Sequence, residues 1–159
     1  RPTLSSSSAA SDVYKRQVSV DEILDELLPD LMDIYEHKQV RLIRKREEQP
    51  FIIRCNHSLA QILVSNLVKN SLLHNREGGE LQVLTTPTSL VIKNTGDVPL
   101  DGEKLFRRFY HGMDGKKDST GLGLAIARSI ALSSLLKLTY EWQNGMHAFR
   151  LVKESKIYR

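Results

Sequence analysis

The sequence predicts an α+β domain, in which helices and paired strands both build the core. Apolar residues recur at helical intervals over 19–37, over 57–75 and again from Gly121 onward. Between and after these stretches lie β-branched and apolar runs, which turn residues join at 86–88 and 144–145. No apolar run approaches the roughly 20 residues that a membrane-spanning helix needs.

The composition is that of one globular domain. The chain has 159 residues, of which 40% are hydrophobic and 26% charged, and a chain of this length buries about two-thirds of its unfolded surface. The single cysteine, Cys55, excludes an intramolecular disulfide and a multi-thiolate metal site. Basic residues give a net charge of +4 but are scattered. They fit a phosphorylated small molecule, and we expect no nucleic-acid partner.

The N-terminal segment, residues 1–17, is serine-rich and has almost no periodicity, so we expect it to be disordered. Residues 4–17 also resemble translated sequencing-adapter readthrough. We therefore expect native sequence to begin near Val18, the folded domain to cover 18–153, and residues 154–159 to form a tail.

The first helix is predicted from Ser19 to about His37. Ser19 and Glu22 have the spacing of a capping box, and Pro29 predicts a kink or a break. Residues 40–43 and 51–54 are then predicted strands around a charged, hairpin-like link. The apolar positions of the helix are Ile23, Leu27, Leu31 and Ile34.

The second helix, 57–75, carries an anomaly. On a helical projection, Asn66 and Asn70 fall in the middle of the apolar face and His74 continues their line. A buried amide without a partner costs about 1–3 kcal/mol, so either both bond to backbone, or a polar ligand or hydrated cation lies against them. Neutral amide oxygens suit Mg²⁺ when phosphates supply the charge. The apolar face comprises Leu59, Ile62, Leu63, Leu67 and Leu73.

Two strands, 80–85 and 89–93, are predicted next, and the loop 94–97 follows them with amide and carboxylate groups beside a glycine. Such a loop is suited to reading a base edge, although on its own it is only a turn. Residues 103–110 predict a short amphipathic helix anchored by phenylalanines, with arginines that are solvated or point at phosphate. The glycine-hinged, charged segment 111–118 predicts a mobile lid.

Gly121 and Gly123 precede a third helical run. Free backbone N–H groups at such a helix start attract anions, and glycine lets phosphate oxygens approach closely. Ser119 and Thr120 can cap the helix or bond a phosphate. Alone, the motif is more often a turn and a cap. A terminal strand pair, 136–142 and 146–152, is predicted to turn at Asn144-Gly145.

The order of these motifs resembles the ATP-binding catalytic domain of two-component sensor histidine kinases, within the gyrase, heat-shock-chaperone, histidine-kinase and mismatch-repair ATPase superfamily. The resemblance covers about residues 18–153. It implies a two-layer α/β sandwich with one mixed sheet of about five strands, three main helices on one face and a flexible ATP lid. The closing stretch 140–149 lacks the common Gly-Gly-Lys-Ile pattern and resembles Bacteroides-type kinases.

The resemblance assigns roles to individual residues. Asn70 is the expected Mg²⁺ ligand, and Asn70, Arg108 and His74 are the expected catalytic residues. Leu73 stands where the family usually has lysine, a role that Lys69 or a lid lysine would take. The expected nucleotide-binding residues are Asn66, Lys69, Asn70, His74, Asn94, Gly96, Phe109, Lys116, Lys117, Ser119, Thr120, Gly121, Leu122, Gly123 and Leu124.

Two departures from the family pattern concern the adenine side of the pocket. Asn94 stands where an aspartate usually accepts the adenine amino proton, and Val98 replaces a glycine. The amide oxygen of Asn94 still accepts a hydrogen bond, but the charge is gone. Adenine affinity and nucleotide selectivity are the properties that these departures affect.

The implied function is Mg-ATP binding and transfer of the γ-phosphoryl group to a histidine on an upstream dimerisation domain absent from this chain. A response-regulator receiver domain is the implied later partner. The domain is expected in the cytoplasm, and the parent protein is expected to be homodimeric and anchored in the inner membrane. The alternatives are a degenerate nucleotide-sensing or scaffolding module and an anti-sigma-factor-type serine kinase.

Overall fold

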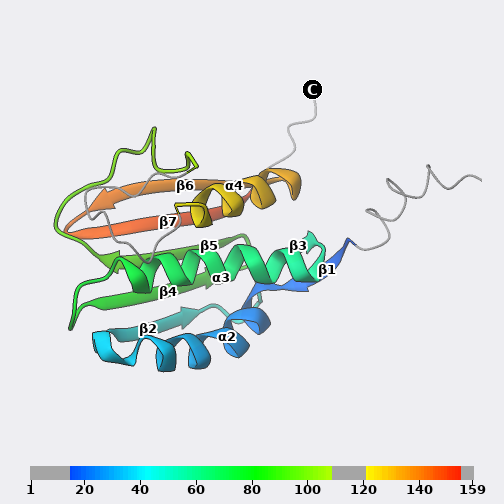
Figure 1. Ribbon diagram of the computed structural model, residues 1–159. Coiled ribbons are helices and arrows are strands. Elements are labelled where there is room, and N and C mark those ends of the chain that lie inside the picture. The colour runs from blue at the N-terminus through cyan, green and yellow to red at the C-terminus, as the bar shows by residue number, and fades with distance from the viewer. Residues whose placement is uncertain (1–14, 109–120, 155–159) are drawn as a thin grey trace, which may run out of the picture.

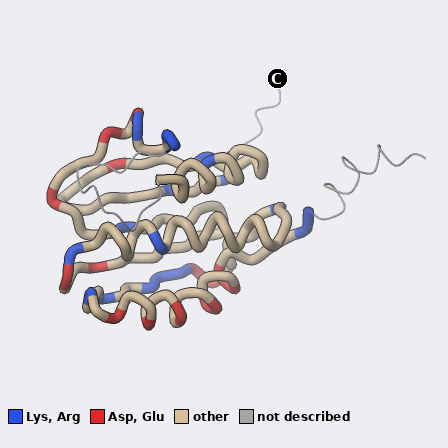
Figure 2. Tube along the Cα trace, in the orientation of Figure 1, with Lys and Arg blue, Asp and Glu red and all other residues tan. Residues whose placement is uncertain are grey.

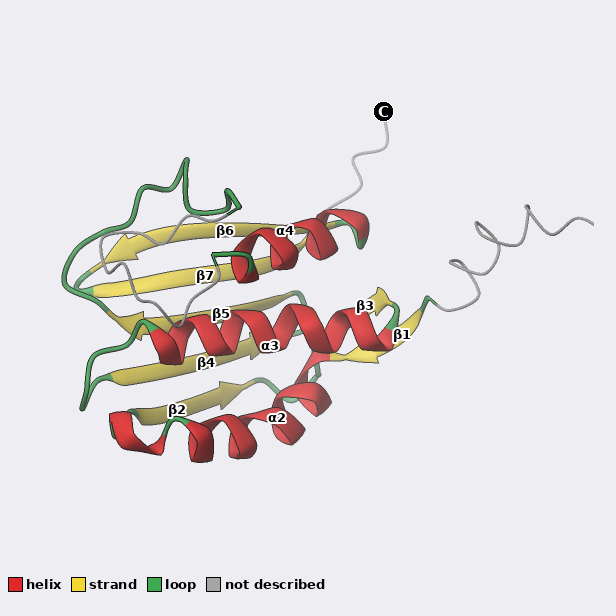
Figure 3. Ribbon diagram, viewed as in Figure 1, coloured by secondary structure: helices red, strands yellow, loops and turns green. Residues whose placement is uncertain are grey.

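Three helices cover one face of a five-stranded mixed sheet (Figures 1 and 3). The computed structural model describes residues 15–108 and 121–154. The helices are α2 (Val20–Ile34), α3 (His57–Leu73) and α4 (Gly123–Ser133). The predicted α+β sandwich is thus confirmed. None of the described helices is long and apolar enough to cross a membrane.

The sheet has the strand order β2-β4-β5-β7-β6. Only the first pair is parallel, which makes the sheet mixed. Both predicted tight turns are confirmed: β4 and β5 pair up to Thr86 and Ser89, and β6 and β7 turn at Asn144-Gly145, where φ is 53° and 74°. The strands are β2 (Arg41–Arg46), β4 (Glu80–Thr86), β5 (Ser89–Thr95), β6 (Leu136–Gln143) and β7 (Met146–Lys153).

A separate two-stranded sheet pairs β1 (Arg16–Ser19) with β3 (Ile52–Cys55). The expected hairpin-like link between the strands at 40–54 is therefore wrong, because β2 pairs with β4 and β3 pairs with β1. Strand β1 also begins two residues inside the segment expected to be disordered. Its backbone is held by the antiparallel ladder with β3, which a composition-based prediction does not see.

Helix α2 begins as predicted, with the Ser19 side chain accepting from the Glu22 N–H at 3.2 Å. It runs through Pro29 without a break and ends at Ile34, and the short 3-10 helix η1 (Glu36–Lys38) follows. Pro29 is tolerated because it lies on the exposed side of α2, where solvent can satisfy the carbonyl that loses its intrahelical donor.

The charge run 44–48 is only partly the solvated turn that the sequence predicts. Arg44 lies in β2, and its guanidinium Nη2 bonds Asp21 Oδ1 at 2.6 Å. Asp21 also accepts from the Phe51 N–H and from the Thr85 hydroxyl. The strand extends further than the apolar pattern indicated because this buried partner on α2 receives the charge.

The face of α3 that packs on the sheet differs from the predicted one. Asn66, Asn70 and Leu73 are half-buried, whereas Leu59 and Ile62 are 41% and 43% exposed. The asparagines thus lie at the margin of the core and not in its middle. The reason is that small and branched side chains complete the true core face, which consists of Ala60, Leu63, Val64, Leu67, Val68, Ser71 and Leu72.

Within the part of 103–110 that the structure describes, the chain forms successive turns and not the predicted amphipathic helix. The Lys104 and Leu105 N–H groups both donate to the Asp101 carbonyl, which closes the first turn. Leu105 is nevertheless buried, and Phe106 packs edge-on against Phe149 with ring centroids 6.4 Å apart. The prediction that Phe106 anchors this segment on the core is confirmed.

Candidate functional site

Helices α3 and α4 meet at Asn66 and Gly123, two of the residues that the sequence assigns to the nucleotide. The Asn66 amide donates from Nδ2 to the Gly123 carbonyl at 3.3 Å. This bond joins the middle of α3 to the first residue of α4, 57 positions further along the chain. The predicted opposition of Asn66 and the glycine-led helix start is therefore present in the fold.

The other α3 residues of the site follow the helical repeat from Asn66. Asn70 is half-buried one turn further on, and its carbonyl accepts from the N–H of His74, the C-terminal cap residue. Lys69 is exposed. The Lys38 ammonium from η1 donates to the carbonyls of Leu73 and Asn75. A lysine from another element thus neutralises the negative end of α3.

The start of α4 has the features of an anion-accepting helix terminus. Gly121 has a φ of 72°, which a residue with a side chain rarely adopts. Leu122 is the cap residue and offers no side-chain acceptor, and the first turn contains no acidic residue. A Cβ on Gly123 would meet only Asn66 Cγ, at 4.0 Å. Packing within the described residues therefore does not require a glycine at position 123.

The side chains around this helix start differ in what they offer. Leu124 packs against the hydrophobic core, so only its backbone can contribute to a ligand site. Ser119 and Thr120, the predicted capping or phosphate-binding residues, lie outside the described residues. So do Phe109, the predicted lid 111–118, and the lid lysines Lys116 and Lys117.

Asn94 lies within β5 and not in a loop after it, because the strand continues to Thr95. Its side chain is 1% exposed. Nδ2 donates to the Thr95 carbonyl at 3.2 Å, and Oδ1 has no hydrogen-bond partner among the described residues. An unpaired buried acceptor is unfavourable by about 1–3 kcal/mol, so a donor from a ligand would stabilise this site.

The chain after Asn94 is held by the β6–β7 hairpin, and sequence reasoning did not assign this role. Trp142 donates from Nε1 to the Gly96 carbonyl at 2.8 Å, and the Leu100 N–H donates to the Tyr140 hydroxyl at 2.9 Å. His147 packs directly against Gly96. Only the strand register, which the Asn144-Gly145 turn fixes, could have indicated that these residues meet the loop.

Arg108 is exposed and is the last residue that the structure describes before residue 121. The segment that carries it is fixed nearby, since the Arg128 guanidinium of α4 lies 5.6 Å from the Phe106 ring centroid. This cation–π contact joins the turns at 101–107 to the helix that begins at Gly123. The fold thus brings the predicted arginine segment to the same helix as the glycine pair.

The charge distribution separates the two sides of the helix layer (Figure 2). Helix α2 carries many acidic residues, whereas α3 and α4 contain none and carry Lys69 and Arg128. Because like charge repels a polyphosphate, the α3–α4 side is the favourable side for an anionic ligand.

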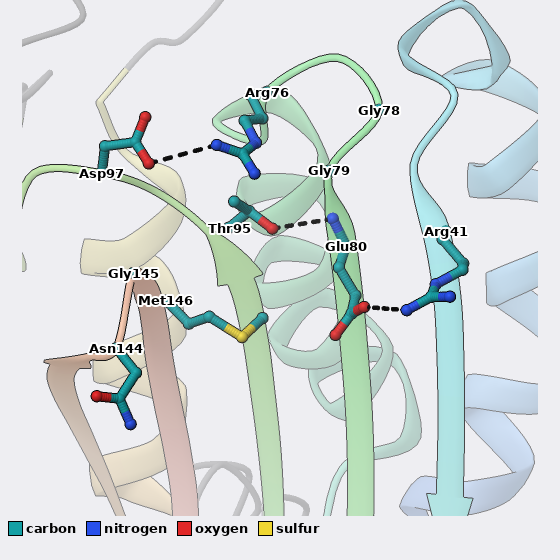
Figure 4. Close-up of a pocket in the computed structure, with 10 residues that line it drawn as sticks. All are labelled: Arg41, Arg76, Gly78, Gly79, Glu80, Thr95, Asp97, Asn144, Gly145 and Met146. Atoms are coloured by element: carbon teal, nitrogen blue, oxygen red, sulfur yellow. Dashed lines mark hydrogen bonds and ion pairs between the residues drawn. The ribbon is translucent and has the colours of Figure 1, made fainter.

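A hollow of about 530 Å³ lies at the end of the sheet, lined by the link from α3 to β4 and by the turn between β6 and β7 (Figure 4). Thr95 lines it, and as the neighbour of Asn94 in β5 its side chain points to the opposite face. Ion pairs Arg41–Glu80 and Arg76–Asp97 line its rim. Hydrogen bonds from Gln82 and Arg41 lower the pKa of Glu80 below its ordinary value. None of the predicted nucleotide-binding residues lines this hollow.

The glycine-led start of α4, which faces the Asn66 amide of α3, is of a kind that suits polyphosphate ligands, and the fold is an α+β sandwich. The profile of the family described as histidine kinase-, DNA gyrase B-, and HSP90-like ATPase matches residues 55–151. The chain belongs to this family, and it is of the type that forms the ATP-binding catalytic domain of histidine kinases.

The curated relatives that it resembles are sensor histidine kinases. It is 39% identical over 77 residues to YvrG of Bacillus subtilis, which covers 43% of this chain and 13% of that protein. It is 26% identical over 142 residues to Hik2 of Synechocystis, which covers 80% of this chain and 33% of that protein. The chain therefore spans a third or less of the length of these relatives.

Solved structures share the fold. The mycobacterial sensor histidine kinase MprB superposes with a TM-score of 0.74 at 21% identity, covering 87% of this chain and 97% of that one. The catalytic domain of the histidine kinase ThkA gives a TM-score of 0.71 at 18% identity, covering 86% and 93%. At these identities the likeness establishes the fold alone.

Proposed function

We propose that this domain binds Mg-ATP and transfers the γ-phosphoryl group to a histidine on a dimerisation domain of the parent protein. The observation that carries the proposal is the Asn66–Gly123 hydrogen bond, which sets the asparagine helix against the glycine-led helix start. Phosphoryl transfer asks a protein mainly for positioning and charge neutralisation. The start of α4 and the flanking amides would position the phosphates, and cationic side chains would neutralise their charge.

In this proposal the phosphates lie at the start of α4 and the adenine lies at Asn94. At one end, the N–H groups that follow Gly121 would hold phosphate oxygens without an acidic side chain nearby. At the other, the unpaired Oδ1 of Asn94 would accept the adenine amino proton. The acid-free α3 and α4 would lie along the triphosphate.

Asn70 is the residue that would hold Mg²⁺. No group of three histidine, cysteine, aspartate or glutamate side chains comes together within 15–108 and 121–154, so phosphate oxygens would complete the coordination. The ion supplies charge neutralisation between the phosphates. Asn66, held by the Gly123 carbonyl, would keep α4 at a fixed separation from Asn70.

Arg108 and His74 would act on the γ-phosphoryl group. Arg108 is exposed, and Phe106 packs against Phe149 two residues earlier, which would hold the arginine near the nucleotide. His74 is the C-terminal cap of α3, and its backbone N–H donates to the Asn70 carbonyl. In the transfer, the acceptor imidazole nitrogen forms a bond to the γ-phosphorus, the bond from that phosphorus to the bridging oxygen breaks, and ADP leaves.

The accepting histidine belongs to another domain. None of the five histidines is followed by the acidic residue and downstream proline of the usual phosphoacceptor motif. The proposed partners are accordingly a phosphoacceptor and dimerisation domain of the same protein and a response-regulator receiver domain. The proposed location of the domain is the cytoplasm, where ATP is available, with a homodimeric parent in the inner membrane.

A nucleotide-sensing or scaffolding module without phosphotransfer is the second candidate. Leu73, Asn94 and Val98 favour it, because each departs from the pattern of active kinases toward a less charged or bulkier side chain. These three positions lie at the phosphate and adenine ends of the proposed site, where such changes would weaken nucleotide binding.

The deciding experiment supplies a separate phosphoacceptor domain from a sensor histidine kinase, together with γ-labelled ATP and Mg²⁺. Acid-labile, base-stable label on that domain is the expected result, since phosphohistidine has this stability. Nucleotide binding by calorimetry without any label would favour the sensing module. Acid-stable label on a serine would identify a serine kinase of the anti-sigma-factor type.

A further inference from the structure

The β6–β7 hairpin grips the chain that follows Asn94 at three backbone points. The Gly96 N–H donates to the Gly145 carbonyl at 2.9 Å, and the Gly96 carbonyl accepts from Trp142 Nε1 at 2.8 Å. Further along, the Leu100 N–H donates to the Tyr140 hydroxyl at 2.9 Å. Both backbone polar groups of Gly96 are therefore committed to one hairpin.

His147 completes this grip from β7. Its side chain is 7% exposed, and in the strand register it lies opposite Asn94. Residues directly opposite in an antiparallel pair share a face of the sheet, so His147 and Asn94 are neighbours on the helix-covered side. The imidazole Nδ1 lies 2.7 Å from the Tyr140 hydroxyl, which ties the ring to the group that holds Leu100.

The position of this ring explains why residue 96 is glycine. A Cβ built on Gly96 would lie far inside van der Waals contact of His147 Nε2 and Cδ2. The backbone of Gly96 is not in the left-handed region, so its conformation does not demand glycine. Glycine is instead required because the imidazole of His147 lies too close to leave room for a Cβ.

We propose that His147 and Tyr140 are positioning residues for the base end of the nucleotide site. The proposal rests on the proposed function, in which Asn94 receives the adenine. The imidazole holds Gly96 and the tyrosine hydroxyl holds Leu100, so that the chain on the far side of Asn94 keeps one conformation. Gly96 then serves the packing of His147, and the nucleotide does not itself require a glycine there.

Glycine is needed at position 96 either because His147 packs against it or because the nucleotide itself requires it. A double-mutant cycle distinguishes these two reasons, because only the first predicts that removing His147 makes Gly96→Ala tolerable. ATP affinity is measured by calorimetry on the full chain for the wild type, Gly96→Ala, His147→Ala and the double variant. We expect Gly96→Ala to weaken ATP binding about tenfold, the scale of one lost buried hydrogen bond. In the His147→Ala background, the same change should weaken binding by less than about threefold.

A third variant tests Tyr140 without enlarging or emptying the core. Tyr140→Phe keeps the ring, which packs against Phe149 with centroids 5.2 Å apart, and removes only the hydroxyl. We expect a loss of ATP affinity of about tenfold. Tyr35→Phe is the matched control, because Tyr35 caps the C-terminal end of α2, a helix that carries none of the proposed nucleotide-binding residues. It should leave ATP affinity unchanged.

Inorganic tripolyphosphate with Mg²⁺ separates positioning of the base from general loosening of the fold, since it lacks a base. Its affinity should be the same in the wild type and in Tyr140→Phe. Equal weakening of tripolyphosphate and ATP would overturn the proposal, as would an equal effect of Gly96→Ala in both histidine backgrounds. A wild-type chain that binds no ATP would instead overturn the proposed function.

Discussion

Asp21 on α2 and Arg44 on β2 form an ion pair of 2.6 Å whose side chains are only 6% and 18% exposed. Asp21 Oδ1 also accepts from the Thr85 hydroxyl at 2.6 Å, and Oδ2 accepts from the Phe51 N–H at 2.8 Å. One carboxylate thus links α2 to two strands of the main sheet and to the chain that enters β3.

Asp21→Asn should destabilise the domain by about 3 kcal/mol, because removing one partner leaves a poorly solvated guanidinium unpaired. The measurement is the free energy of unfolding from urea titration at neutral pH. Asp25→Asn is the matched control on the same helix. Its pair with Arg46 is 3.1 Å long and about half exposed, so its loss should change stability by less than about 1 kcal/mol. Equal effects of the two variants would contradict the role of the buried pair.

The same carboxylate predicts a dependence of stability on pH. Burial by itself raises the pKa of Asp21, but hydrogen bonds from Thr85 and Phe51 and the charge of Arg44 outweigh it, so the pKa lies below its ordinary value. The unfolded state therefore binds the proton first. The stabilisation is complete above an ordinary aspartate pKa of about 3.9 and is lost as the pH falls below it.

The stability difference between the wild type and Asp21→Asn should accordingly be largest at pH 7 and should shrink toward pH 3. Urea titrations of both proteins across this range measure it. A difference that stays constant would show that Asp21 has the same pKa in the folded and unfolded states.

Local sequence patterns predicted much of this fold, and the misses share a physical cause. The capping box at Ser19 and the Asn144-Gly145 turn are determined by neighbours within a few residues, and both were correct. Arg44 appeared in a charge run and was expected in solvent. Its partner Asp21 lies 23 positions away, and no local pattern reports such a pairing.

In the candidate site, too, local patterns were predictable from the sequence and long-range contacts were not. The asparagine spacing and the glycine pair were visible in the sequence, and the fold brings Asn66 to Gly123. The support behind Gly96 was not visible, because it depends on which residue of β7 comes to lie opposite Asn94. A shift of that register by one position would turn His147 to the other face of the sheet.

Asn70→Ala should reduce ATP affinity in the presence of Mg²⁺ by at least about tenfold, because the ion loses its proposed protein ligand. Affinity in the presence of a chelator should be the same as that of the wild type. Calorimetric titrations with and without Mg²⁺ measure both. Gln61→Ala, an exposed change on the same helix, should affect neither titration. Unchanged affinity of Asn70→Ala in Mg²⁺ would remove Asn70 from the metal site.

Asn94→Asp should make the free domain less stable and its response to ATP larger. The new carboxylate would be buried and would face the Thr95 carbonyl that Nδ2 now contacts, which is unfavourable by about 1–3 kcal/mol. A bound adenine would donate to that carboxylate and offset the loss. Thermal unfolding with and without Mg-ATP tests this, and an ATP-induced shift no larger than that of the wild type would argue against adenine at Asn94.

Gly123→Ala should separate stability from ligand binding at the start of α4. Alanine favours the helix, and the added Cβ would meet only Asn66 Cγ at 4.0 Å, so the free domain should be stabilised by about 0.5 kcal/mol. The same methyl group would occupy space that phosphate oxygens need, and ATP affinity should fall about tenfold. Thermal unfolding and calorimetry measure the two effects. Ser129→Ala, exposed on the same helix, should leave ATP affinity unchanged. If Gly123→Ala binds ATP as tightly as the wild type, the phosphates do not approach this helix start, and the glycine pair serves only the turn before α4.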